Sequence, residues 1–168
     1  SILYSNVGSM TGFQLRDRLK AEFRELPSEI LTSMDLLLRH LKQQNIKSVF
    51  HYGGIAATEV FANSGITVVP DNKTADVLVF TSLPSGDWIR ASQSVLRLIN
   101  SYKVKNVILA NPDRLLPGEH VGINVGMMFD MLVKSWPAND YPLSLLEIGK
   151  PRLNRNDFNI GNEEQIGR

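Results

Sequence analysis

The sequence has no cysteine, and this absence removes several kinds of chemistry. Without a thiol the chain forms no disulfide, offers no thiolate nucleophile and supplies no cysteine-ligated zinc site. The segment Ser1–Tyr4 lacks the basic start and the apolar core of a signal peptide. We therefore expect a cytoplasmic protein. Because the first residue is not methionine, we also expect either a processed N-terminus or a piece of a longer chain.

The sequence also lacks an excess of charge and a long apolar run. It has 18 Lys and Arg against 17 Asp and Glu, a net charge of +1. This balance gives no reason to expect a nucleic acid or an anionic membrane as a partner. The apolar runs are far shorter than the roughly 20 residues that a membrane span needs. The histidines (His40, His51 and His120) show no metal-ligand spacing, so we predict no metal site.

What the sequence does have is a regular alternation of strands and helices. Short apolar or β-branched runs predict strands at 2–4, 48–52, 66–69, 75–80, 106–110 and 145–148. Apolar residues at helical spacing predict helices at 12–23, 33–41, 55–61, 85–102 and 127–132, with Ser33 as the cap of the second. The segment 118–126 is expected to be a loop. This alternation predicts an α/β fold with a mainly parallel sheet.

Polar residues follow two of the predicted strands that are far apart in the sequence. Ser5 and Asn6 follow the first strand, and Gly149-Lys150-Pro151 follows the last. In open α/β sheets ligands bind at the carboxyl ends of strands. A hydroxyl from Ser5 and an ammonium from Lys150 would suit a phosphate, so we predict that they share one anion site. The alternative for Lys150 is that it is an exposed loop lysine. A third polar segment, Asn111-Pro112-Asp113, also follows a predicted strand, and its residue types alone are typical of a plain turn without a role in binding.

The order and spacing of these segments resemble those of the haloacid dehalogenase (HAD) superfamily, in particular its NagD-like and p-nitrophenyl-phosphatase-like branch. The resemblance covers about residues 1–151. It rests on Ser5-Asn6, Ser9–Gly12, Ile30–Ser33, Gly53-Gly54, Asn111-Pro112-Asp113 and Ile148–Pro151.

The resemblance implies a Rossmann-like core interrupted by an α/β cap. Residues 1–32 would be the first piece of the core, 33–144 the cap, and 145–168 a second piece of the core with a polar tail. The family hydrolyses phosphate monoesters with Mg²⁺ through an aspartyl-phosphate, so the implied substrate is a small phosphorylated metabolite.

The resemblance also implies roles for individual residues. Ser5 and Asn6 match the second family motif, which binds the phosphoryl group. Lys150 matches the lysine of the third motif, which neutralises the nucleophile and the phosphate and is the one implied catalytic residue. The cap loop that faces the substrate is matched by Asn111, Pro112 and Asp113.

The sequence departs from the family in two motifs. It contains no Asp-x-Asp, which supplies the nucleophile and the acid–base group, and no Gly-Asp strand end that would supply acids for Mg²⁺. Without these groups phosphoryl transfer has no covalent route. We therefore expect this chain alone to be inactive, as a fragment or a degenerate relative. The alternative is a non-catalytic scaffold, and in either case we expect a homo-oligomer or a partner that covers the incomplete core.

Overall fold

The computed structural model describes residues 1–101, 103–116, 122–135 and 143–149. The strands in this part of the chain are β1 (Ile2–Ser5), β2 (Glu29–Thr32), β3 (Ser48–Tyr52), β4 (Thr67–Val68), β5 (Val77–Phe80), β6 (Asn106–Leu109), β7 (Leu115–Leu116), β8 (Gly122–Ile123) and β9 (Ser144–Glu147). The helices are α1 (Gly12–Leu19), α2 (Ser33–Gln43), α3 (Ile55–Asn63), α4 (Trp88–Asn100) and α5 (Val125–Phe129), which continues into a π-helical turn, η1 (Asp130–Lys134).

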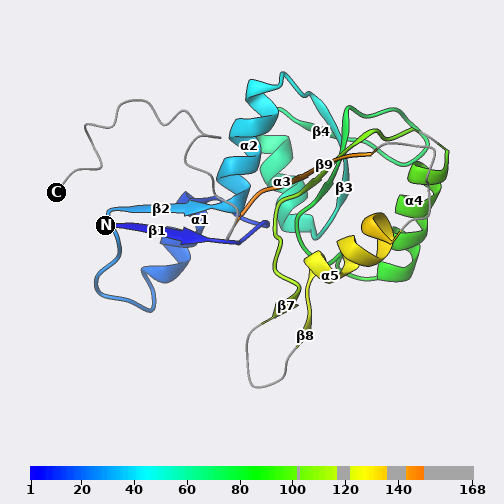
Figure 1. Ribbon diagram of the computed structural model, residues 1–168. Helices are drawn as coiled ribbons and strands as arrows, with labels where there is room; N and C mark the ends of the chain where they lie inside the picture. Colours follow the sequence, from blue (N-terminus) through cyan, green and yellow to red (C-terminus); the bar gives the residue numbers. More distant parts are fainter. Residues whose placement is uncertain (102, 117–121, 136–142, 150–168) are drawn as a thin grey trace.

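Two parallel sheets organise the described residues. The larger sheet has five strands in the order β4-β3-β5-β6-β9, and β1 and β2 form a second parallel pair. Figure 1 shows the β1–β2 pair and α1 on one side of the molecule, with α2 between this pair and the larger sheet. The strands β7 and β8 form a short antiparallel hairpin that projects from the larger sheet. The predicted α/β class with a mainly parallel sheet is therefore confirmed.

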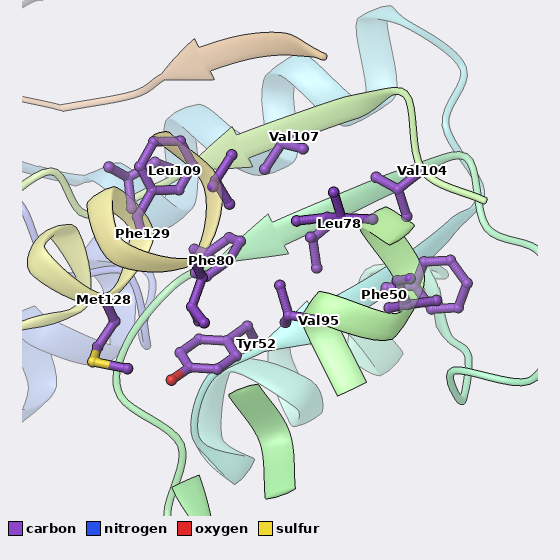
Figure 2. Close-up of a cluster of buried hydrophobic side chains, with 14 of the residues drawn as sticks. Phe50, Tyr52, Leu78, Phe80, Val95, Val104, Val107, Leu109, Met128 and Phe129 are labelled. Atoms are coloured by element: carbon purple, nitrogen blue, oxygen red, sulfur yellow. The ribbon is translucent and has the colours of Figure 1, made fainter. Parts of the chain in front are cut away.

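Both faces of the inner strands β3, β5 and β6 are covered, which explains why these strands are mostly apolar. Alternate residues of β3 and β5 point to opposite faces: Phe50 and Leu78 pack with α4 and α5, whereas Val49 and Val77 pack with α2 and α3. Figure 2 shows the first of these clusters. At its centre the ring centroid of Phe80 lies 4.8 Å from that of Tyr52 and 5.3 Å from that of Phe129. The planes of the Phe80 and Phe129 rings are at 90° to each other.

The structure corrects three predictions of local structure. Helix α1 ends at Leu19 rather than at Phe23, which is 55% exposed and so adds no buried apolar contact that would extend the helix. Thr32, rather than Ser33, caps α2. The predicted loop 118–126 contains β8, which is too short for a strand pattern to show in the sequence.

Strand β9 lies across a predicted domain boundary. It pairs along its whole length with β6, from Asn106 with Ser144 to Leu109 with Glu147. The five-stranded sheet therefore includes residues on both sides of the predicted boundary at 144/145. The division of the chain into core and cap stays a prediction.

No helix within the described ranges is long and apolar enough to cross a bilayer.

The aromatic cluster predicts a large loss of stability for Phe80→Ala. Phe80 is fully buried between two rings, so truncation leaves a cavity and should lower the free energy of unfolding by about 3–5 kcal/mol. The matched control is Phe13→Ala, an exposed site where the change should stay within about 0.5 kcal/mol. Urea denaturation of both variants measures the difference, and equal losses would contradict this account of the core.

Candidate functional site

Three loops at the carboxyl ends of strands meet at one place. The side-chain amide of Asn6, after β1, donates from Nδ2 to Oδ1 of Asp113, after β6, at 2.8 Å across 107 residues of sequence. Gly149, after β9, lies against both loops. A Cβ there would be 2.7 Å from Oδ1 of Asn6 and 2.7 Å from Cδ of Pro112. Its φ of +137° also favours glycine, so only this residue permits so close an approach.

The Asn111-Pro112-Asp113 segment is a turn and also part of this meeting point. The Asn111 Oδ1 accepts from the backbone N–H of Asp113 at 3.2 Å, the local bond that asparagine makes in turns. Gly126, the second residue of α5, donates its N–H to the carbonyl of Asp113 at 3.1 Å. A Cβ on Gly126 would lie only 2.6 Å from the Pro112 carbonyl. The start of α5 therefore stabilises the turn through a hydrogen bond and close packing.

The loop between β1 and α1 packs against the larger sheet. Gly8 is buried, and a Cβ on it would overlap the backbone carbonyl of Thr81, which follows β5. Thr81 is itself fully buried. Asn6 and the loop that follows it thus contact the residues that follow β6 and β5, respectively.

A partly buried histidine lies beneath this contact, and the sequence analysis gave it no role. His51 on β3 is bonded through Nε2 to Oγ1 of Thr81 at 2.8 Å and through Nδ1 to Oγ1 of Thr58 at 3.0 Å. Burial lowers the pKa of His51 to about 4, so the ring is neutral at pH 7. Gly53 leaves the ring its space, because a Cβ there would overlap Nε2 of His51. The sequence signal that could have drawn attention to His51 is a histidine within an apolar strand, two residues before Gly-Gly.

Tyr4 is a second residue that the sequence analysis did not single out. Burial, and then the negative charges of Asp113 and Asp35, raise the pKa of Tyr4 to about 12. Its hydroxyl therefore keeps its proton at physiological pH.

A network of ion pairs connects the turn after β6, the π-helical turn η1 and the end of β9. Arg114, next to Asp113, donates from Nε to Asp130 at 2.7 Å, and Lys134 joins Asp130 at 3.2 Å to Glu147 at 2.6 Å. The hydrogen bond to Glu147 raises the pKa of Lys134, which stays charged. Since Asp130 and Lys134 belong to η1, this turn connects the end of β9 to the turn after β6.

Of the predicted site residues, Asn6, Pro112 and Asp113 are brought together with Gly149, and Asn111 shapes their turn. Ser5 is partly buried at the end of β1, opposite Thr32 of β2. Lys150 lies outside the described residues. The predicted convergence of its ammonium with the Ser5 hydroxyl therefore stays a prediction.

The described residues do not fit the Mg²⁺ that the resemblance implies. They contain no group of three or more His, Asp or Glu side chains placed to hold a metal ion. At the meeting point of the loops the donors are one carboxylate, from Asp113, and the amide of Asn6. Magnesium requires near-octahedral oxygen coordination, which these two groups alone do not provide.

A cavity of about 620 Å³ lies elsewhere and is not our candidate site. It is lined by Asp76, Asn106 and Ser144, which stand at or before the amino ends of β5, β6 and β9. Ligands of parallel α/β sheets bind at the opposite, carboxyl edge. None of the predicted site residues within the described ranges lines this cavity.

The fold is that of solved HAD-superfamily phosphatases. The chain is similar to a p-nitrophenyl phosphatase from Archaeoglobus fulgidus (23% identity, TM-score 0.69), covering 86% of this chain and 54% of that one. It is also similar to a 4-nitrophenylphosphatase from Thermotoga maritima (18% identity, TM-score 0.70), covering 89% of this chain and 55% of that one. A third similar structure is NagD from E. coli K-12 (20% identity, TM-score 0.63), with 79% of this chain and 51% of that one covered. The chain spans about half the length of these structures. No protein-family model and no curated protein sequence matches it.

These likenesses confirm the predicted HAD-like, NagD-branch fold. At such low identities they establish the fold alone, and function has to be argued from the residues themselves.

The Asn6–Asp113 bond predicts strong energetic coupling between two loops. In a double-mutant cycle of Asn6→Ala and Asp113→Ala we expect a coupling energy of about 1–3 kcal/mol, because the bond is charge-assisted and partly buried. The control cycle is the exposed pair Asp17–Lys20, at 2.8 Å, with an expected coupling below about 0.5 kcal/mol. Urea denaturation gives both values, and a coupling as small as that of the control would refute the role of the bond.

His51 predicts a pH-dependent stability. Between pH 6.5 and about 4 the unfolded chain binds a proton at His51 that the folded chain does not bind. Stability should therefore fall as the pH drops through this window, by about 3 kcal/mol from this residue. His51→Gln should lose this part of the slope, measured as the difference between the two proteins in urea denaturation at pH 4–7. Parallel stability profiles for the two proteins would show that His51 does not titrate in this way.

Proposed function

We propose that this chain forms the phosphoryl-binding strand end and the cap of a HAD-type phosphate monoesterase that acts on a small phosphorylated metabolite. The observation that carries the proposal is the convergence of Asn6, Asp113 and Gly149 at one edge of the parallel sheets. Three segments that match separate family motifs are thus in contact. A cytoplasmic protein that forms a homo-oligomer or binds a partner over its incomplete core stays our expectation.

In this proposal the hydroxyl of Ser5 donates a hydrogen bond to a phosphoryl oxygen, and Asn6 fixes the backbone that positions Ser5. The Asn6 amide is held on both sides, since Nδ2 donates to Asp113 and Oδ1 packs closely against the backbone of Gly149. This fixes the amide orientation and, with it, the exit of β1. Lys150, one residue beyond Gly149, would supply the positive charge that a phosphate needs. The substrate's leaving group would lie against the turn 111–113.

The proposal assigns no chemical step to the described residues, because they include neither the family nucleophile nor a fitting set of metal ligands. Binding and orientation of the substrate are the contributions that these side chains can make. The aspartyl-phosphate and Mg²⁺ dependence belong to the proposal by resemblance only.

A scaffold function is the second candidate, and exposed apolar residues favour it. Ile2 is 54% exposed and Leu3 37% on β1, and Phe13 and Phe23 project from the same small unit. Parallel strands are normally covered on both faces, so this unit is suited to binding another protein surface.

Phosphatase activity of the polypeptide encoded by the complete open reading frame distinguishes the two candidates. With p-nitrophenyl phosphate and Mg²⁺ we expect a turnover of about 1 per second or more, in the usual enzyme range. Asn6→Ala should lower kcat/KM by about tenfold or more by releasing the exit of β1. Asp87→Ala, which removes a helix cap on α4, is the control and should leave kcat/KM unchanged.

Absence of turnover on a panel of small phosphate monoesters would overturn the enzymatic proposal and favour the scaffold. The same conclusion would follow if the reading frame encoded only these 168 residues and they proved inactive.

A further inference from the structure

The loop between β1 and α1 is anchored to the start of α2 at three successive points. The carbonyl of Val7 accepts from the backbone N–H of Met34 at 3.3 Å. The carbonyl of Met10 accepts from the hydroxyl of Thr32 at 2.8 Å. The N–H of Gly12 donates to Oδ2 of Asp35 at 2.8 Å. Every second or third residue of the loop is therefore bonded to one helix end.

One carboxylate oxygen is the centre of this arrangement. Oδ2 of Asp35 lies 2.8 Å from the N–H of Gly12, 2.8 Å from the N–H of Thr32 and 2.9 Å from the Thr32 hydroxyl. The hydroxyl has a single proton, which it shares between Asp35 and the carbonyl of Met10. Gly12 and Thr32 are buried and their bonds to Asp35 are partly buried, where charge-assisted bonds are stronger than at the surface.

Capping of α2 alone does not require this geometry. A capping box needs only Thr32 and Asp35, each bonded to the other's backbone N–H. The bonds to Met10 and Gly12 go to a different element, 22 and 23 residues earlier in the chain. The N-cap of α4 shows the contrast: the hydrogen bond described for Asp87 goes to Arg90 within its own helix.

The position of Gly12 supports the same conclusion. A Cβ at this residue would overlap the carbonyl of Ile30 and lie 3.0 Å from Oδ2 of Asp35. The backbone at Gly12 is thus pressed between β2 and Asp35. A larger residue would displace the loop from its carboxylate anchor.

Helix α2 also connects the loop to the larger sheet. Its apolar side, with Met34, Leu37 and Leu41 all fully buried, packs in the cluster that includes Ala110 and Ile148, the residues that follow β6 and β9. The anchor therefore attaches the loop after Asn6 to the same body that presents Asp113 and Gly149.

We infer that Thr32 and Asp35 are positioning residues, which hold the loop 7–12 so that Ser5 and Asn6 keep their places at the site. The expected effect of these residues on phosphate binding rests on the proposed function. The anchoring of the loop does not depend on that function.

The test compares Asp35→Ala, Asp35→Asn and Asp87→Ala in the polypeptide encoded by the complete reading frame. Both alanine variants remove an aspartate from a helix cap, but Asp35→Ala also removes the bond to Gly12, so urea denaturation should show a larger loss of stability for Asp35→Ala than for Asp87→Ala. Amide hydrogen exchange in peptides covering residues 7–12 should rise at least tenfold in Asp35→Ala and stay unchanged in Asp87→Ala. Asp35→Asn keeps an acceptor oxygen and should restore most of the protection.

Binding of inorganic phosphate, measured by calorimetry, is the second readout. We expect Asp35→Ala to weaken it about tenfold and Asp87→Ala to leave it unchanged. If Asp35→Ala does not fold, Thr32→Val serves instead, since it removes the bond to Met10 at similar volume and should raise exchange at residues 7–12 in the same way.

The outcomes separate the two claims. Exchange at residues 7–12 that is no faster in Asp35→Ala or Thr32→Val than in Asp87→Ala overturns the inference. A wild-type protein that binds no phosphate overturns the proposed function, while the exchange data still decide whether Thr32 and Asp35 anchor the loop.

Discussion

The hydrogen bond between Asn6 and Asp113 is the interaction on which the geometry of the site depends. It joins the end of the small β1–β2 sheet to the end of a strand in the five-stranded sheet, across 107 residues. Such a bond can form only if both sheets present their carboxyl ends to each other, and Gly149 can approach only because it has no side chain. The bond, the glycine and the parallel strand order therefore support one arrangement, in which three loops surround a small polar region.

The loop after Asn6 connects the two sheets because it touches both. Gly8 packs on Thr81, which follows β5, and Gly12 packs against the carbonyl of Ile30 in β2 and is bonded to Asp35 at the start of α2. Beneath it His51 is neutral and bonded on both sides, so the contact carries no buried charge to be compensated. A site that must bind a phosphate benefits from such a fixed surround, because ordered donors need not be reorganised when the ligand arrives.

The fold was more predictable from the sequence than the site. The strand at 48–52 was predicted with its observed bounds, because a strand covered on both faces is a short apolar run with clear ends. Helix α1 was predicted too long because Phe23 continues the apolar helical spacing in the sequence but is exposed in the structure. The contact of Asn6 with Asp113 leaves no periodic signal, and only the family resemblance placed these residues together. His51 was missed because its two threonine partners come from other elements, which spacing along the chain cannot reveal.

The central claim is that this meeting point of three loops binds phosphate, and NMR tests it most directly. Inorganic phosphate would be titrated into ¹⁵N-labelled protein while backbone and side-chain amide shifts are followed. Our account predicts saturable shifts at the Asn6 side-chain amide and at the backbone amides of Gly8 and Gly149. Shifts confined to the cavity near Asp76 and Asn106, or no saturable shifts at all, would contradict it.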